Sequence, residues 1–201
     1  MSNTKPFQRS CEQNKGPLLA VLEVEFASSS CLLEIGSGTG QHAVFFAQHL
    51  PHLSWQCGDV KSRHDGINAW ISEYPRKNLL RPIEVDIPDK FWKSGSFDAH
   101  FSANTAHIMN RTAVKAMMAA VSDTLPIGGV FCQYGPFTQD GDFSTSSNLE
   151  FHRSLVERGY GGYRDTQELI EWAPALTLDR IVSMPANNLT LVWRKVQKRN
   201  S

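Results

Sequence analysis

Hydrophobic and polar positions follow two periods along this chain, one typical of helices and one typical of buried strands. Apolar residues spaced three and four apart form a stripe that an amphipathic helix can bury. This spacing predicts helices at residues 14–27, 40–50, 65–74, 111–125, 149–158 and 165–173. Short apolar runs that end at turn residues predict strands at 31–35, 53–57, 83–87, 97–103, 130–134, 176–184 and 189–196.

Strands that alternate with helices are typical of a mostly parallel sheet covered by helices on both faces. The last two strands differ, because residues 185–188 alone join them and a tight connection joins antiparallel strands. The sequence therefore predicts an α/β, Rossmann-like, seven-stranded, mostly parallel sheet with a C-terminal antiparallel hairpin. We expect a single domain over residues 1–201, with an N-terminal helical segment over about 1–28.

The charge balance narrows the choice of partners and compartment. The 201 residues include 20 Lys and Arg against 20 Asp and Glu, so the formal net charge is zero. This balance lacks the basic excess typical of proteins that bind nucleic acids or anionic membranes. The N-terminus has no apolar signal-peptide core, and no apolar run reaches the roughly 18 residues of a membrane span. We expect a cytoplasmic protein that binds neither nucleic acid nor membrane.

The cysteines and histidines do not indicate a metal site. His49 and His52 form an HxxH pair, but no third ligand accompanies them in the sequence. The four cysteines have no metal-ligand spacing and are expected to be free thiols in a reducing compartment: Cys11, Cys31, Cys57 and Cys132.

A glycine-rich loop joins the first expected strand to the following helix. Glycines let a backbone turn sharply and approach a ligand, while a helix N-terminus offers free N–H groups. The segment 38–43 also fits the GxGxxA form of dinucleotide-binding loops, so a nicotinamide cofactor stays open on this loop alone. The loop itself runs Glu34-Ile35-Gly36-Ser37-Gly38-Thr39-Gly40.

Two aspartates are expected at the edge of the sheet to which this loop belongs. Asp59 follows the second strand, where a carboxylate can accept hydrogen bonds from both hydroxyls of a ribose. Asp86 ends the third expected strand, where it could meet an adenine amino group. Ligands of open α/β sheets bind at the carboxyl ends of the strands. For either residue alone, the competing interpretation is a helix N-cap.

Taken together, these features resemble the S-adenosylmethionine-dependent methyltransferases of class I. The resemblance rests on ExGxGxG at 34–40, the two strand-end acids, the strand segment 97–99 and the turn 125–129. More narrowly, the chain resembles the little-characterised methyltransferase-like protein 26 family at 34–43, 55–56, 102–104, 134–136 and 184–188. The resemblance implies the fold and S-adenosylmethionine as cofactor, and it implies no acceptor substrate.

The implied cofactor site comprises the glycine loop and residues at the ends of the next strands. Two positions depart from the family pattern. Gln13 replaces an expected arginine, which weakens any anion-binding role of the N-terminal segment, and Gly58 stands where Ser or Thr is expected before the ribose acid. The expected cofactor-binding residues are Glu34, Gly36, Ser37, Gly38, Gly40, Asp59, Val60, Asp86, Ile87 and Ser102.

Three residues near the same edge are candidates for holding or deprotonating the acceptor. Asn104 and His107 follow the fourth strand, and Tyr134 ends the fifth. His107 titrates in the range of a general base, with simple packing after the strand as the competing interpretation. Thr105 and Ala106 interrupt the Asn-Pro-Pro pattern of adenine methyltransferases acting on nucleic acid.

The loop 135–147, rich in Gly, Ser, Thr and Asp, is expected to cover the acceptor. Four residues beyond the loop are expected to help to cover the acceptor: Asn148, Phe151, Arg164 and Asp165. Three aromatic residues are expected to form an apolar wall there: Tyr160, Tyr163 and Trp172. The sequence thus favours a methyltransferase acting on an unidentified small molecule. A non-catalytic cofactor-binding or interaction protein and an NAD(P)-dependent oxidoreductase are the alternatives, and the oligomeric state stays open.

Overall fold

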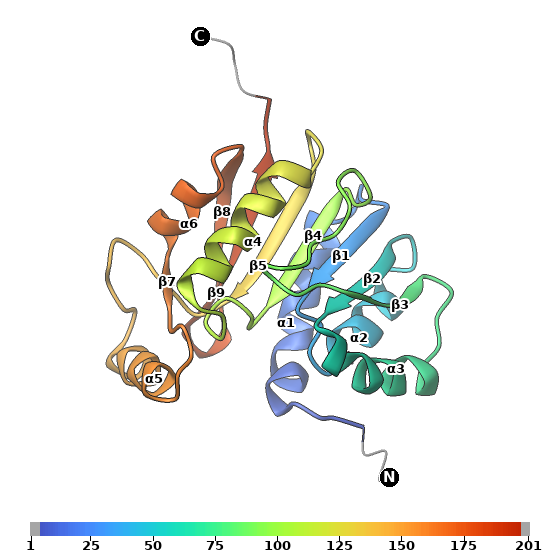
Figure 1. Ribbon diagram of the computed structural model, residues 1–201, viewed down its shortest axis with the longest axis horizontal. Helices are drawn as coiled ribbons and strands as arrows, with labels where there is room; N and C mark the ends of the chain where they lie inside the picture. Colours follow the sequence, from blue (N-terminus) through green and yellow to red (C-terminus); the bar gives the residue numbers. More distant parts are fainter. Residues whose placement is uncertain (1–4, 198–201) are drawn as a thin grey trace.

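A seven-stranded sheet forms the centre of the structure, a computed structural model that describes residues 5–197 (Figure 1). The strands are β1 (Cys31–Ile35), β2 (Ser54–Asp59), β3 (Leu79–Glu84), β4 (Ala99–Ala103), β5 (Val130–Gly135), β8 (Leu176–Met184) and β9 (Asn188–Lys195). Their order is β3-β2-β1-β4-β5-β9-β8. The first five are parallel, and β9 is antiparallel to both β5 and β8. The predicted mostly parallel sheet with a closing hairpin is confirmed.

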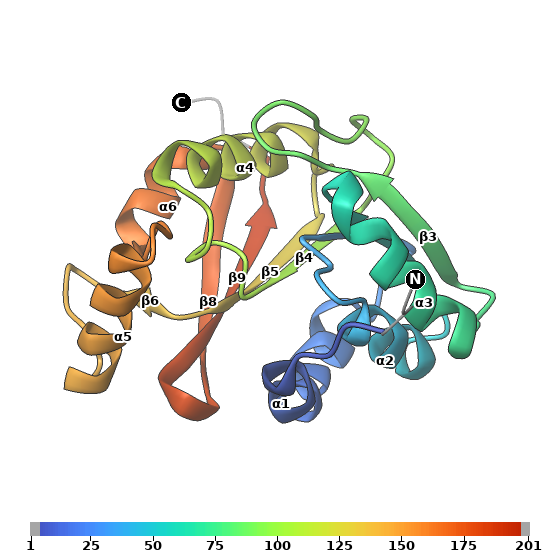
Figure 2. The same ribbon diagram turned by 60° about the horizontal axis from the view of Figure 1, so that its bottom comes forward.

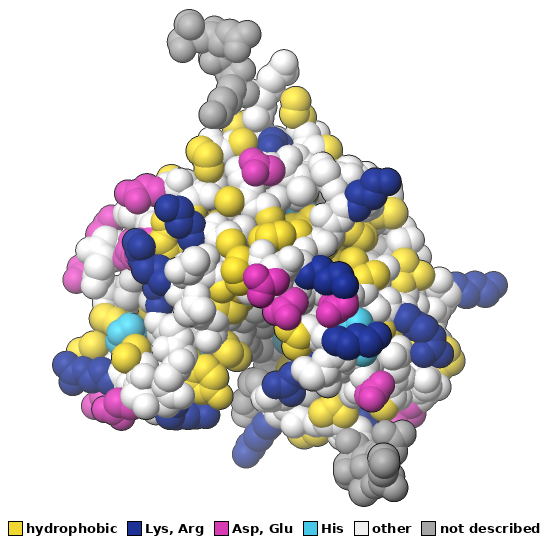
Figure 3. Space-filling view, in the orientation of Figure 1, with side chains coloured by type: hydrophobic (Ala, Val, Ile, Leu, Met, Phe, Trp, Pro, Cys, Tyr) yellow, Lys and Arg dark blue, Asp and Glu magenta, His cyan; other side chains and the backbone are white. Residues whose placement is uncertain are grey.

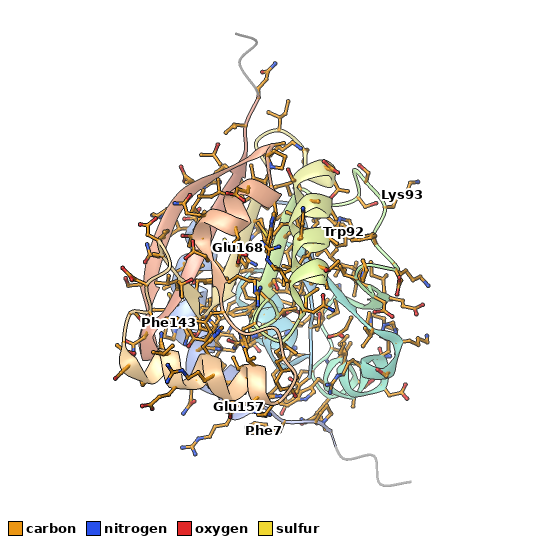
Figure 4. The ribbon with its side chains drawn as sticks, turned by 60° about the vertical axis from the view of Figure 1, so that its left-hand side comes forward. Phe7, Trp92, Lys93, Phe143, Glu157 and Glu168 are labelled. Carbon is orange, nitrogen blue, oxygen red and sulfur yellow. The ribbon has the colours of Figure 1, made fainter. Side chains whose placement is uncertain are left out.

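Helices cover both faces of this sheet, as Figures 1 and 2 show. One face packs against α1 (Arg9–Glu25), α2 (Gln41–His49) and α3 (His64–Glu73), through a core that includes Leu22, Phe46 and Ile67. The other face packs against α4 (Arg111–Thr124) and α6 (Thr166–Trp172), through a core that includes Val114 and Trp193. Trp92, labelled beside α4 in Figure 4, joins this second core and donates its indole N–H to Thr124.

The third strand lies earlier in the chain than expected. The apolar run at 83–87 predicted a strand there, whereas β3 spans Leu79–Glu84. Because β3 is an edge strand with Leu80 and Arg81 exposed, its own alternation of apolar residues is weak. Val85 follows the strand and is buried in the second core, so its apolar side chain does not mark a continuation of β3. Asp86 therefore lies two residues beyond β3, where its backbone pairs with that of Lys90.

The N-terminal helix begins at Arg9, earlier than expected, and Pro17 lies inside it and not in its first turn. Residues 5–8 precede this helix without regular secondary structure and contact α3, where Trp70 donates its indole N–H to the carbonyl of Pro6. At the other end of α1, buried Glu25 pairs with Arg180 and Arg194 of the closing hairpin. Residues 1–4 of the expected helical segment, and both ends of the expected domain, lie outside the described residues.

A second, two-stranded sheet was not predicted. The expected loop 135–147 contains β6 (Phe137–Thr138), which pairs in parallel with β7 (Arg164–Asp165). Strands of two residues carry no readable period, so the sequence could not indicate them. The helix α5 (Ser146–Glu157) lies between these strands in the chain and stands at the outer side of the molecule (Figure 2).

The described residues include no helix that is long and apolar enough to cross a membrane. The cytoplasmic location stays a prediction. His49 and His52 each donate a ring N–H to a backbone carbonyl, of Phe45 and Phe26 respectively. One ring nitrogen of each histidine is therefore bonded to backbone, for His49 within α2 and for His52 at the C-cap of α1.

Candidate functional site

A cavity of about 680 Å³ opens at the carboxyl ends of β1, β2, β4 and β5. The first turns of α1 form another part of its wall, as do α5 and the turn η2 (Pro185–Asn187) between β8 and β9. Figure 3 shows the molecule hollowed at the lower centre, between the side that carries α5 and the side that carries α3. Of the expected site residues, the lining includes Gly36, Ser37, Gly38, Asp59, Val60, Asp86, Ile87, Asn104, His107 and Tyr134.

The glycine loop has a backbone that other residues adopt with difficulty. Gly36, Gly38 and Gly40 have φ values of 79°, 59° and 89°. A Cβ atom at Gly36 would lie 2.6 Å from the Thr105 hydroxyl, and one at Gly40 would lie 3.1 Å from Cα of Ile67. At Gly38 a Cβ atom would meet nothing within 4 Å, because this glycine faces the cavity. Gly36 and Gly40 are thus required by the fold, and Gly38 leaves space for a ligand.

Asp59 connects the end of β2 to the glycine loop. Its Oδ2 accepts a hydrogen bond from the Gly38 N–H at 2.6 Å, and its Oδ1 accepts one from the Val60 N–H at 2.8 Å. Burial raises the pKa of this carboxyl, and the two backbone donors oppose that rise. Each carboxylate oxygen can accept more than one hydrogen bond, so acceptor capacity toward the cavity remains. The N-cap residue of α3 is Arg63, which excludes the helix-cap interpretation of Asp59 for that helix.

Three expected cofactor residues lie outside the cavity lining. Glu34 is buried below the loop and accepts a hydrogen bond from the Trp55 indole at 3.1 Å, and burial raises its pKa to about 7. Gly40 forms the N-cap of α2. Ser102 is buried within β4, and its hydroxyl has no partner among the described residues. A strand-end position alone did not distinguish these residues from those that face the cavity.

The candidate acceptor residues gather at the carboxyl ends of β4 and β5. Asn104 adopts a left-handed φ of 56°, and its N–H donates to the carbonyl of Tyr134. His107 is buried, which lowers the pKa of its imidazole to about 4, and its ring lies 6.1 Å from that of Phe151 on α5. Burial raises the pKa of the Tyr134 hydroxyl. At neutral pH both side chains are therefore uncharged groups on the cavity wall.

The glycine-rich segment 159–164 holds the backbone around His107. The N–H of Gly162 donates to the carbonyl of His107, and the guanidinium of Arg164 donates to the carbonyls of Gly161 and Gly162. Tyr163 packs near Phe143, which is labelled in Figure 4 beside α5, at a ring separation of 5.5 Å. Arg164 thus stabilises the backbone that contacts His107.

Other residues expected around the acceptor have structural roles. Trp172 packs in the second core beneath the Arg111 guanidinium, so it forms no part of an aromatic wall. Asp165 caps α6 in a capping box with Glu168. Asn148 donates to the carbonyl of Asn187, and this bond joins α5 to the closing hairpin. Tyr160 is partly exposed beyond α5.

Sequence reasoning missed the contribution of the first turns of α1. Gln8, Ser10, Cys11, Gln13 and Asn14 all line the cavity. Asn14 is buried, with Oδ1 2.6 Å from Nε2 of His42 on α2. The resemblance pointed to an N-terminal segment that includes Gln13, but no local pattern indicated that this segment would lie beside Tyr134 at the end of β5.

The buried histidines predict a loss of stability in acid. Burial lowers the pKa values of His42, His100 and His107 to about 4, 3 and 4, below the ordinary value of 6.5. Their contribution to stability is present above pH 6.5 and is lost as the pH falls toward 4. Glu34 has a raised pKa of about 7, so between pH 4.5 and 7 the folded state binds this proton and stability rises as the pH falls. Near pH 5.5 unfolding should take up about two protons, so stability should fall by about 3 kcal/mol per pH unit.

Urea unfolding between pH 7 and pH 5 measures this slope, and His100→Leu separates one proton from it. His100 is fully buried, without a hydrogen-bond partner for either ring nitrogen among the described residues. The variant should keep its stability at pH 7. Of the pH dependence of the unfolding free energy that the three histidines contribute together, it should lose about one third. An unchanged slope in His100→Leu would mean that this ring is protonated in the folded protein.

Comparison with solved structures identifies the class of fold. The mitomycin 7-O-methyltransferase MmcR matches with a TM-score of 0.80 and 14% identity, over 93% of this chain and 54% of that one. An O-methyltransferase family protein from Burkholderia thailandensis matches at 0.79 and 14%, over 92% and 57%. Human N-acetylserotonin methyltransferase, solved in complex with S-adenosylmethionine, matches at 0.71 and 11%, over 94% and 58%. The chain has the class I fold of S-adenosylmethionine-dependent methyltransferases and spans little more than half the length of these proteins.

The family is shown by the sequence itself. A family model described as "Protein of unknown function (DUF938)" matches residues 5–195, and the chain belongs to that family. The narrower resemblance to the methyltransferase-like protein 26 family is not supported by these comparisons. Membership in this family carries no substrate with it, so the site has to be interpreted from its own residues.

Proposed function

We propose that this protein transfers a methyl group from S-adenosylmethionine to a small-molecule acceptor. One observation carries the proposal: a single cavity joins the glycine loop and Asp59 on one wall to His107 and Tyr134 on the other. The first wall fits a nucleoside, because Gly38 leaves open space beside a carboxylate that can accept ribose hydroxyls. The fold shared with methyltransferases supports the same interpretation.

In this proposal the cofactor side is formed by Gly36, Ser37, Gly38, Asp59, Val60, Asp86 and Ile87. When bound, S-adenosylmethionine supplies a sulfonium methyl group, whose transfer leaves the electron pair on sulfur and releases the acceptor's proton. Asp59 would hold the ribose, and Asp86 and Ile87, beyond β3, would flank the adenine. Glu34 and Gly40 would support the loop from below.

The acceptor side orients the nucleophile and excludes water. His107 is neutral at pH 7 and can accept the proton that the acceptor releases, or a hydrogen bond from it. Asn104 and Tyr134 would help to position the acceptor. α5 would close the wall, with Phe151 facing the cavity.

Nucleic acid is not part of the proposal. Basic and acidic side chains are interspersed on the face seen in Figure 3, in keeping with zero net charge. A cytoplasmic location and a single domain over the whole chain likewise stay predictions.

Cofactor binding separates this proposal from a nicotinamide-dependent oxidoreductase. Calorimetric titration should show S-adenosylmethionine and S-adenosylhomocysteine binding at least ~10-fold more tightly than NAD(P), a difference of about 1.4 kcal/mol. The reason is that the sheet ends in an antiparallel hairpin, whereas the last strands of dinucleotide-binding domains are parallel. The glycine loop also has the form ExGxGxG, whereas the dinucleotide-binding loop has the form GxGxxG. Tighter binding of NAD(P) would reverse the assignment.

Turnover separates an enzyme from a protein that only binds the cofactor. Incubation with cell extract and methyl-labelled S-adenosylmethionine should yield a labelled small molecule, identified by mass spectrometry. His107→Ala should reduce its formation while leaving cofactor binding within about two-fold. Cofactor binding without any labelled product would favour the non-catalytic alternative.

A further inference from the structure

The cavity has two chemically different halves. Its charged lining residues, Asp59, Arg63 and Asp86, all belong to the half assigned to the cofactor. The rest of the lining comes from the β4–α4 connection, the end of β5, α5, the closing hairpin and the first turns of α1, which also contact the glycine loop and the start of α2. Among the described residues that line this other half there is no Asp, Glu, Lys or Arg. A ligand there meets neutral polar groups and apolar surface.

The neutral polar groups have a defined direction of hydrogen bonding. Asn14 Oδ1 can only accept, so His42 donates its Nε2–H to that oxygen at 2.6 Å. The low pKa of His42, about 4, keeps this ring neutral at pH 7. Because Oδ1 is engaged, the amide NH₂ of Asn14 is left for Tyr134 and for the cavity. Asn14 therefore offers a donor, held in place by a buried neighbour.

This half also has an apolar surface. Phe151 extends from α5 into the lining and is 44% exposed, enough for its ring to contact a ligand. Met109 and Pro136 continue the same surface. Aromatic rings pack well against such surfaces, in offset or edge-to-face arrangements.

We propose that the acceptor is an uncharged ring compound that presents a carbonyl oxygen or ring nitrogen to Asn14. This inference rests on the proposed function and names the substrate class of the same site. An ionised carboxylate or phosphate entering this half would lose its hydration without meeting a cation, which is costly. A neutral ring with one acceptor atom satisfies the Asn14 donor and packs against Phe151.

Two matched compounds test the charge preference directly: 4-hydroxyquinoline, which is uncharged at pH 7, and its 2-carboxylate. Their dissociation constants are measured by ligand-observed NMR titration in the presence of saturating S-adenosylhomocysteine. The wild-type protein should bind the uncharged compound at least ~10-fold more tightly, a difference of about 1.4 kcal/mol. Equal or tighter binding of the carboxylate overturns the inference, as does failure of both compounds to bind at about 1 mM.

Gln13→Arg provides a gain-of-function test, because Gln13 is an exposed residue of the cavity lining. A guanidinium there should pair with the carboxylate and make the 2-carboxylate the tighter ligand. Val24→Arg is the matched control, since it adds the same charge to the far end of α1, where the side chain is 66% exposed and outside the lining. An equal shift in both variants would mean that the preference reflects overall charge and not the cavity.

Asn14→Leu tests the hydrogen-bond donor. The variant should bind the uncharged compound ~10-fold more weakly than the wild-type protein does. Its affinity for S-adenosylhomocysteine should stay within about two-fold of the wild-type value. An unchanged affinity for 4-hydroxyquinoline overturns the role of Asn14. If the variant is unfolded by circular dichroism, the comparison of Gln13→Arg with Val24→Arg still decides the charge preference.

Calorimetry with S-adenosylhomocysteine on the same samples distinguishes the two levels of failure. If the wild-type protein does not bind S-adenosylhomocysteine, the proposed function is overturned, and the proposed acceptor class with it. Normal cofactor binding combined with a carboxylate preference overturns the acceptor class alone.

Discussion

Replacing Asp59 by alanine is expected to weaken S-adenosylhomocysteine binding by ~30- to 1,000-fold. The carboxylate lies at the end of β2 beside Gly38 and is the group assigned to the two ribose hydroxyls. Hydrogen bonds to charged groups contribute about 1.5–3 kcal/mol each, so a bidentate pair should contribute ~2–4 kcal/mol. Isothermal titration calorimetry measures the loss, at about 1.4 kcal/mol per decade.

Two variants give this experiment its controls. Asp59→Asn should lose less affinity, because an amide oxygen can still accept one of the bonds. Asp65→Ala, an exposed aspartate in the first turn of α3 and outside the cavity lining, should change affinity by less than about two-fold. Asp59→Ala also removes the acceptor of the Gly38 N–H, so its folding should be verified by thermal unfolding.

A double-mutant cycle separates ribose binding from support of the loop. A 2′-deoxyribose analogue of the cofactor should bind the wild-type protein poorly and lose little further affinity in Asp59→Ala. If the two losses add, Asp59 does not contact that hydroxyl, and its role is confined to the Gly38 backbone.

Gly38→Val is the second substitution with a large expected effect. It should weaken cofactor binding by at least ~100-fold, which corresponds to about 2.7 kcal/mol of binding free energy. A Cβ atom at this position meets no protein atom within 4 Å and projects into the cavity. The branched side chain would therefore occupy space that the cofactor needs, while clashing with nothing in the fold. Calorimetry with S-adenosylhomocysteine measures the affinity.

The control has to account for backbone strain, because Gly38 has a φ of 59° and a β-branched residue is strained there. Gly128→Val offers a match: its φ is 83°, its Cβ atom would also meet nothing within 4 Å, and it lies in the turn before β5, outside the cavity lining. Both variants should lose comparable stability, and Gly38→Val alone should lose cofactor binding. Retained affinity in Gly38→Val would remove the loop from the cofactor site.

The glycine loop and the aspartate beside it could be predicted because their sequence signals are local. A glycine loop between a strand and a helix, followed by an aspartate at the next strand end, needs only the order of elements to bring them together. Gly38 and Asp59 lie 21 residues apart and are joined by a hydrogen bond between the ends of adjacent parallel strands. Glu34 and Ser102 were expected to bind the cofactor, but both are buried outside the cavity lining. The direction of a side chain at a strand end depends on the neighbours that it meets in the folded protein.

The acceptor side could not be predicted to the same depth. Asn14, His42 and Tyr134 come from α1, α2 and β5, and no local spacing relates them. They converge because Leu18 and Leu22 bury α1 against the same core as the strands, which carries the first turns of that helix over the cavity. Long-range packing of this kind has no period in the sequence.

The sequence by itself determined the alternation of elements, the closing hairpin, the glycine loop and the aspartate at the end of the second strand, since each depends on residues close together in the chain. Only the tertiary structure decided that β3 ends before Asp86, that Trp172 belongs to the core, and that the charged residues of the described cavity lining are Asp59, Arg63 and Asp86. The physical reason is burial: the environment of Asn14, His107 or Phe151 is set by segments that meet only when both faces of the sheet are covered. The same burial keeps His107 neutral, a property that no neighbouring residue in the sequence indicates.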